Sequence, residues 1–201
     1  MSWIETIPPE RATGRLKSLY GRIAGPDGRV DNILTAHALR PHTLEGHMVL
    51  YKAVLHHAAN RIEGWVLESI GVYVSLLNEC DYCVEHHFAG LRRLLADDES
   101  ADRLGSALRA RTPGAAFDRR NAAALDYAAR LTTQPASITA DDIERLRSAG
   151  FDDGEILEIN QVASYFAYAN RVVLGLGVVM RGDVPGLSPA NVSDASDWHH
   201  G

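Results

Sequence analysis

The sequence of 201 residues lacks the features of several common functional classes. No apolar run approaches the roughly eighteen residues that a membrane-spanning helix needs. Lysine and arginine are scattered, and with a net charge of −6 there is no basic cluster to bind nucleic acid or an acidic membrane surface. There is no Gly-rich phosphate loop, and the opening MSWIETIPPE does not have the pattern of a secretion signal. We therefore expect a cytoplasmic protein that acts on neither nucleic acid nor membrane.

Cysteine is scarce, and the two cysteines form a motif. Cys80 and Cys83 are spaced C-x-x-C, and His87 follows four residues after the second. A helix over 80–95 would place all three side chains on one face. Asn78 is a good helix stop, so the cysteines would lie in a first helical turn, where the helix dipole stabilises a thiolate. His87 could then pass a proton to or from Cys83.

From the residues alone, this C-x-x-C pair has three interpretations. The cysteines could be redox thiols, half of a metal site or two small buried side chains. His86 competes with His87, because it lies three residues from Cys83. Glu68 lies in the apolar stretch 65–77, and carboxylates are rarely buried without a partner. It is therefore either on an exposed face or functional.

Three further histidines raise the question of a metal. His47, His56 and His57 belong to one predicted helix, but no spacing rule brings them near the sulfurs. We assign no metal ligand and no cofactor, and we leave the roles of these histidines open.

Apolar residues recur with helical periodicity, and no alternation is long enough for a sheet. The stretch 65–77 is apolar nearly all round, which predicts a central, buried helix. Thr139 with Asp142, and Asn60 with Glu63, have the spacing of capping boxes. We predict an all-α bundle of about eight to nine helices, over 8–23, 31–39, 41–57, 60–77, 80–96, 97–110, 118–133, 139–150 and 152–180.

Two parts of the chain differ in composition. Residues 1–182 are predicted to form a single helical domain, and residues 183–201 are polar and rich in Gly, Pro and Ser. Such a segment is typical of a flexible tail or an arm that swaps onto a neighbouring subunit.

The array of Glu68, C-x-x-C and His87 resembles that of the AhpD-like alkylhydroperoxidases of the carboxymuconolactone decarboxylase superfamily. The chain is similar to the peroxidase-related members of this family over about residues 2–180. The stretches that carry the likeness are SWIETIPPERATGRLKSLY, VDNILTAHALRPHTLEGHMVLYKAVL, SLLNECDYCVEHH and GFDDGEILEINQVASYFAYANRVVLGLGV.

The resemblance implies a role for each residue of the array. Cys83 would attack the peroxide, Cys80 would resolve the intermediate, and Glu68 and His87 would relay protons. Typical peroxidase members place a histidine directly before the second cysteine, where this chain has Tyr82. A phenol with a pKa near 10 is a poor base, so the relay is incomplete by the family pattern.

The sequence therefore predicts a thiol-dependent peroxidase, an antioxidant enzyme with a redox-active disulfide. Its partners would be a hydroperoxide and an external thiol or dithiol reductant, and the resemblance implies a homo-oligomer, either trimer or hexamer. The alternative is a C-x-x-C and histidine protein that binds metal or senses redox state without efficient turnover. A decarboxylase or lactone reaction is less favoured, because such members do not depend on a cysteine pair.

Overall fold

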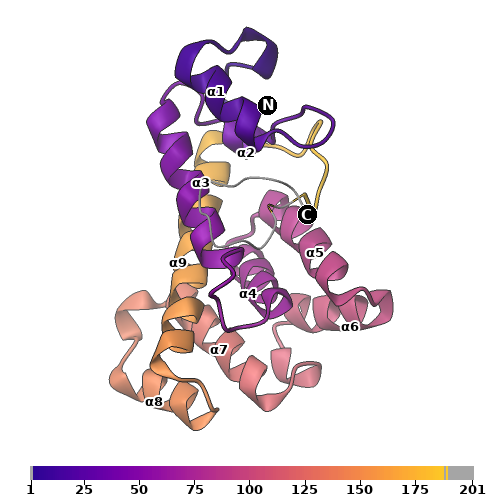
Figure 1. Ribbon diagram of the computed structural model, residues 1–201. Coiled ribbons are helices and arrows are strands. Elements are labelled where there is room, and N and C mark those ends of the chain that lie inside the picture. The colour runs from indigo at the N-terminus through magenta and orange to yellow at the C-terminus, as the bar shows by residue number, and fades with distance from the viewer. Residues whose placement is uncertain (1, 188, 190–201) are drawn as a thin grey trace.

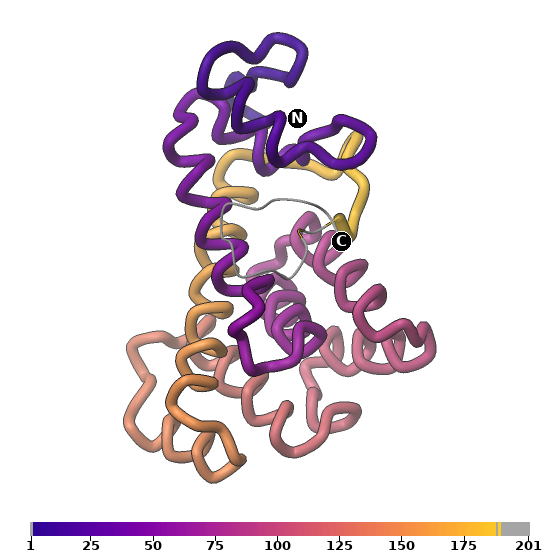
Figure 2. The backbone as a smooth tube through the Cα atoms, in the orientation of Figure 1, coloured from indigo at the N-terminus to yellow at the C-terminus, as the bar shows by residue number. Residues whose placement is uncertain are grey.

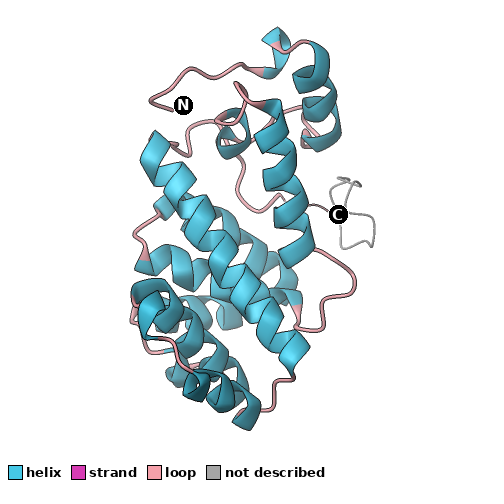
Figure 3. Cartoon of the chain, turned by 90° about the vertical axis from the view of Figure 1, so that its left-hand side faces the viewer, coloured by secondary structure: helices cyan, strands magenta, loops and turns pink. Residues whose placement is uncertain are grey.

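The computed structural model describes residues 2–187 and 189, and in this part of the chain every regular element is helical (Figures 1 and 3). The predicted all-α class is confirmed. The α-helices are α1 Gly14–Ile23, α2 Asn32–Thr35, α3 Pro41–Leu55, α4 Gly64–Leu77, α5 Asp81–Leu95, α6 Asp98–Arg109, α7 Arg119–Thr133, α8 Ala140–Ser148 and α9 Asp153–Leu176. Short 3-10 turns cover Pro9–Arg11, Pro113–Ala115 and Pro135–Ser137.

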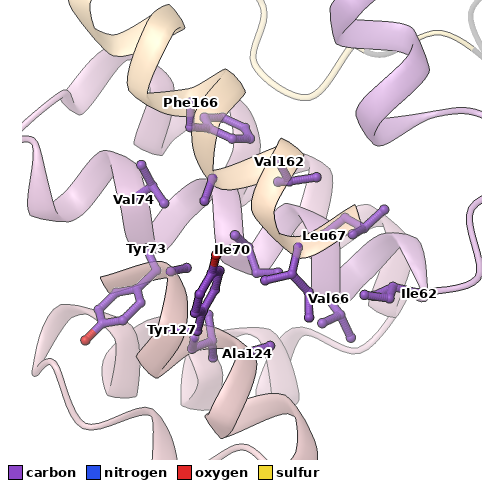
Figure 4. Packing of buried hydrophobic residues seen from close by; sticks show 14 of the residues in the cluster. Ile62, Val66, Leu67, Ile70, Tyr73, Val74, Ala124, Tyr127, Val162 and Phe166 are labelled. Carbon is purple, nitrogen blue, oxygen red and sulfur yellow. The ribbon is translucent and has the colours of Figure 1, made fainter. Parts of the chain in front are cut away.

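The helix α4 is the centre of the bundle, as its apolar composition predicts. It packs against α5, α7 and α9, and its residues 66–75 are all buried. Phe166 of α9 closes onto Gly71, where a Cβ atom would lie only 2.2 Å from the ring. Figure 4 shows this core, with side chains of α4 between those of α7 and α9. The central helix therefore carries Glu68 in the interior.

Several predicted helix ends differ from the structure. The first predicted helix is split, because Ala12 and Thr13 are extended after the turn Pro9–Arg11 and α1 begins only at Gly14, which has a positive φ of 53°. The last helix ends at Leu176, where Gly177 adopts a left-handed φ of 61°. The predicted capping box of Asn60 is wrong. Its Nδ2 donates to the Val54 carbonyl, 3.1 Å away, and α4 begins one turn later.

Two other helix starts are reciprocal capping boxes. Thr139 and Asp142 form the predicted box at α8, and Asp152 forms a second with Glu155 at α9. Each box satisfies backbone N–H groups that a helix start leaves without partners. These two helices are thus fixed in place at the end of the bundle remote from the cysteines (Figure 1).

The predicted tail begins with an anchored stretch. The carboxylate of Asp183 accepts hydrogen bonds from the Asn32 amide and from the Tyr82 hydroxyl. Figure 2 shows the segment after α9 returning beside the loop that precedes α2. The rest of the predicted tail, residues 188 and 190–201, lies outside the described residues. No helix in the described part of the chain is both long enough and apolar enough to span a membrane.

Candidate active site

The two cysteines lie at the junction of α4 and α5. Asn78 caps the end of α4, as predicted, and Glu79 turns the chain with a φ of 56°. Cys80 is then the N-cap of α5, and Cys83 lies in its first turn. Both are free thiols, with exposed fractions of 0% and 3%. The turn between two packed helices therefore places a reduced pair inside the protein.

The two thiols interact, and their pKa values move in opposite directions. The Cys83 side chain donates a hydrogen bond to Cys80, and this bond lowers the pKa of Cys80. The same bond, followed by burial, raises the pKa of Cys83 well above its usual value. A hydrogen bond from Asn170 lowers the pKa of both thiols. The pair thus favours a negative charge on Cys80, whereas the sequence analysis expected the thiolate on Cys83.

Asn170 of α9 is held in place beside the thiols. Its Nδ2 donates to the Ser75 hydroxyl, 3.0 Å away, and its Oδ1 accepts from Asn78, 2.9 Å away. It is 1% exposed. These bonds fix the amide, so the hydrogen bond that it provides to the sulfurs does not depend on solvent.

Glu68 and His87 form a buried pair. The Nδ1 atom of His87 lies 2.7 Å from Oε2 of Glu68, and the two side chains are 14% and 2% exposed. Gly90 makes room for this carboxylate, because a Cβ atom there would lie 3.0 Å from Oε1. The bond through Nδ1 leaves Nε2 on the opposite edge of the ring. Glu68 is therefore a buried partner of the histidine, and the exposed-face interpretation is wrong.

A second histidine lies on the other side of Glu68. Nε2 of His56, which caps α3, is 3.9 Å from Oε1 of Glu68 and 3.0 Å from the Tyr51 hydroxyl. Burial, and then the charge of Glu68, raises the pKa of Tyr51 well above its usual value. Tyr51 therefore stays a phenol, and the Glu68 carboxylate is flanked by two imidazoles.

Cys83, Glu68 and His87 meet at one cavity of about 70 Å³. One water needs about 10–15 Å³ of such space, so this cavity admits several waters or a small organic molecule. Cys80 is not part of its wall. The other lining residues come from α1, α2, α3, α5, α9 and two loops: Ile23, Asp31, Ile33, Leu34, His47, Met48, Tyr51, Tyr82, His86, Gly90, Tyr165, Ala169, Gly186, Leu187 and Pro189.

Tyr82, between the cysteines, acts as a structural link in place of a base. Its hydroxyl donates to Oδ2 of Asp183 at 2.5 Å and accepts from the Ile33 amide at 3.2 Å. Burial raises the pKa of Tyr82, so it does not ionise under ordinary conditions. His86 Nε2 lies 3.6 Å from the same carboxylate, while His87 is the histidine paired with Glu68.

The histidines that raised the question of a metal have other partners in the described part of the chain. Among the residues that the structure describes, no group of three or more His, Cys, Asp or Glu side chains is arranged to hold an ion. His47 and His56 contact different tyrosines, Tyr165 and Tyr51, and Nδ1 of His57 accepts from the Ala59 amide.

Sequence reasoning missed several residues of this site. Tyr51, Gly90 and Asp183 were not singled out, and His56 was named without a role. Asn170 fits the pattern of the resembled family, but its chemistry could not be assigned from the sequence. Only Gly90 had a sequence signal that could have pointed to the site, since a glycine inside a helix usually marks a close contact.

Comparison with solved structures finds neighbours over most of the chain. An uncharacterised peroxidase-related protein from Silicibacter sp. TM1040 shares 29% identity at a TM-score of 0.72, and the alignment covers 88% of this chain and 87% of that one. A peroxidase-related protein from Ralstonia eutropha JMP134, described as an alkylhydroperoxidase AhpD core, shares 23% identity at a TM-score of 0.77, with coverage of 92% and 97%.

A third neighbour has a different activity. A variant of the debrominase Bmp8 bound to 2,3,4-tribromopyrrole matches with a TM-score of 0.67 and 14% identity, covering 90% of this chain and 95% of that one. At this identity the match shows the fold alone. No family model and no curated protein matches the sequence.

Proposed function

Because the chain belongs to the AhpD-like superfamily, we propose that it is a thiol-dependent peroxidase that reduces hydroperoxides. The observation that carries the proposal is the cavity wall, where Cys83 lies with the buried pair of Glu68 and His87. A nucleophile and a carboxylate-oriented histidine beside one small cavity are the groups that peroxide reduction requires.

In the first step, the Cys83 thiolate attacks the terminal oxygen of the hydroperoxide ROOH. The O–O bond breaks, Cys83 becomes a sulfenic acid, and the alkoxide takes a proton to leave as the alcohol ROH. We assign that proton to His87, whose orientation Glu68 fixes through Nδ1. The sulfur is oxidised by two electrons, and the peroxide is reduced by two.

Cys80 has two roles in this proposal. Because the negative charge rests on Cys80, its thiolate can accept the proton of Cys83 along the hydrogen bond that already joins the two side chains, in an uphill transfer that the attack on the peroxide draws forward. As a thiol, it then attacks the Cys83 sulfenic acid, which releases water and forms the disulfide. An external thiol or dithiol must supply two electrons and two protons to reset the pair.

Cys83 is proposed as the attacking residue because it lines the cavity and Cys80 does not. The test is peroxide-dependent turnover with a dithiol reductant in Cys83→Ser. We expect activity to be lost, while helix content and the thermal midpoint stay near those of the unaltered protein. Activity at the unaltered level in this variant would overturn the assignment.

The alternative of a redox sensor without turnover uses the same cysteines. The same assay separates the two, because a sensor forms its disulfide once and then consumes no further peroxide in the presence of reductant.

We also propose that the chain assembles with copies of itself. Exposed apolar side chains lie on α3 and α9, which pack side by side (Figure 1). They are Val49 and Leu50 on α3 and Leu157, Tyr168 and Leu174 on α9. Exposed apolar surface of this kind often marks an interface. Light scattering would show a trimer or hexamer if this is correct, and a monomer if it is not.

A further inference from the structure

The described wall of the cavity that contains Cys83 is acidic in its fixed charges. Among the described residues that line it there is neither lysine nor arginine, while Asp31 and Glu68 supply acidic groups. Residues 188 and 190–201, which the structure does not describe, also contain no lysine or arginine in their sequence. A carboxylate brought into this cavity would lose its hydration without gaining a lysine or arginine partner, and His87 in the wall is already paired with Glu68.

His47 is a buried part of the wall with an unsatisfied nitrogen. It is 4% exposed, and its Nδ1 atom has no hydrogen-bond partner among the described residues. Its other nitrogen, Nε2, lies 3.5 Å from the Tyr165 hydroxyl. A buried polar atom without a partner is costly, so a ligand that supplies one gains affinity.

The neighbouring His37 shows the contrast. Its ring centroid is 4.8 Å from that of His47, yet both of its nitrogens are satisfied, by the Ile33 carbonyl at 2.9 Å and the Tyr168 hydroxyl at 3.3 Å. His37 is not part of the cavity wall. Of these two neighbouring histidines, only His47, which lines the cavity, has an unsatisfied nitrogen. Nε2 of His86, also in the wall, has no hydrogen bond among the described residues, but it lies 3.6 Å from the carboxylate of Asp183.

Burial also fixes the charge of His47. Desolvation, followed by the nearby His37, lowers the pKa of His47 to about 3. The imidazole is therefore neutral near neutral pH, and it provides a hydrogen bond without attracting an anion. A hydroxyl group, which both donates and accepts, satisfies Nδ1 whichever nitrogen carries the proton.

We propose that this cavity selects compact, neutral organic molecules that carry a hydrogen-bonding group for Nδ1 of His47, and that it rejects carboxylates. The inference rests on the proposed function, because such a molecule would supply the organic part of the hydroperoxide that Cys83 reduces. The aromatic wall of Tyr51, Tyr82 and Tyr165 favours flat or branched apolar groups.

The test measures binding without chemistry. In the full chain with Cys80→Ser and Cys83→Ser, we would titrate phenol, toluene and benzoate by NMR at neutral pH. Phenol should bind about three- to tenfold more tightly than toluene, the gain expected for one buried hydrogen bond. Benzoate should bind at least about tenfold more weakly than phenol, because its charge is desolvated without a partner. Benzoate binding as tight as that of phenol, or no phenol binding at all, would overturn the proposal.

A second variant tests His47 itself. His47→Phe in the same background should reduce phenol binding to the level of toluene, whereas the control His37→Phe should keep the preference for phenol. A preference that survives His47→Phe would contradict the role given to Nδ1. The benzoate comparison needs no change at His47, so the proposal stays testable if that variant fails to fold.

These outcomes are independent of peroxidase activity. If the cysteine-free protein binds the probes as expected but the unaltered protein does not reduce hydroperoxides, the proposed function fails and the binding preference stands. If turnover occurs but the preference is absent, only the inference about substrate selection fails.

Discussion

The Nδ1 atom of His87 lies 2.7 Å from Oε2 of Glu68, although nineteen residues of sequence separate them. The bond joins α4 to α5 inside the bundle, directly beside the cavity that exposes Cys83. A carboxylate placed in this way fixes both the ring orientation and the nitrogen that faces the cavity. The first prediction concerns this pair.

Glu68→Gln should lower the rate of peroxide reduction by about 10²-fold or more, in line with the loss of general acid catalysis. The amide still fills the space but no longer stabilises a protonated His87. Stopped-flow measurement of peroxide-dependent thiol loss would give the rate. Glu85→Gln is the control, since Glu85 is exposed on the same helix as His87 and should leave the rate unchanged. Equal rates in the two variants would remove the relay from the mechanism.

Gly90→Ala tests the space that Glu68 occupies. The added methyl group would lie 3.0 Å from Oε1 of Glu68, so the carboxylate must shift away from its bond to His87. We expect activity to fall several-fold, although alanine is the better helix former. Gly175→Ala is the control, because nothing lies within 4 Å of its Cβ position. That change should leave activity intact and stabilise the fold by about 0.5–1 kcal/mol. Full activity in Gly90→Ala would show that Glu68 needs no fixed position.

Cys80→Ala should move the pKa of Cys83 down toward its usual value. The hydrogen bond to Cys80 is the first cause of the raised pKa, and the substitution removes it. Below the raised pKa Cys83 is a thiol, so its alkylation in the unaltered protein should become fast only at high pH. The pH dependence of iodoacetamide labelling, read by mass spectrometry, measures the shift. An unchanged or higher midpoint in the variant would mean that burial alone sets this pKa.

Tyr82→Phe should destabilise the fold by about 1–3 kcal/mol, because it leaves buried partners unpaired. The Ile33 amide loses its acceptor, and Asp183 loses one of its donors. Urea unfolding of the variant and the unaltered protein gives the change in the free energy of unfolding. Tyr73→Phe serves as the control, since Tyr73 is also a buried residue and the described residues give its hydroxyl no hydrogen bond. A loss no larger than that of the control would mean that Tyr82 does not anchor the stretch at Asp183.

Asp142→Asn should weaken the fold at neutral pH and have little effect in strong acid. The Thr139 amide, and then Arg145 and Arg130, lower the pKa of Asp142 in the folded state. A lowered pKa contributes stability above the unfolded pKa of about 3.9, and this contribution is lost as the pH falls through the folded value. Thermal unfolding of the unaltered protein and the variant, from neutral pH down to strong acid, measures the difference in stability. A difference that persists in strong acid would show that the effect is not one of charge.

Periodicity and composition were enough to predict the all-α fold and the central position of the apolar helix around Glu68. They also placed the cysteines correctly at a helix start, because Asn78 and the polar residues after it interrupt the apolar pattern. Helix ends were less certain where a glycine adopts a positive φ, as at Gly14 and Gly177, since sequence does not show which glycine turns the chain.

The electrostatics of the site could not be read from the sequence. The helix dipole predicted a thiolate in the first helical turn, but the hydrogen bond between the thiols and their burial decide which sulfur carries the charge, and both depend on tertiary packing. His56 and Asn170 reach the site from helices distant in sequence. Spacing along one helix cannot reveal such contacts.

The most direct test of the account is to identify which sulfur the peroxide oxidises. Reduced protein is treated with one equivalent of tert-butyl hydroperoxide in the presence of dimedone and analysed by peptide mass spectrometry. We expect a disulfide between Cys80 and Cys83 in the unaltered protein, and a trapped sulfenic acid on Cys83 in Cys80→Ser. Unoxidised thiols, or a sulfenic acid that forms on Cys80 in Cys83→Ser at the unaltered rate, would contradict it.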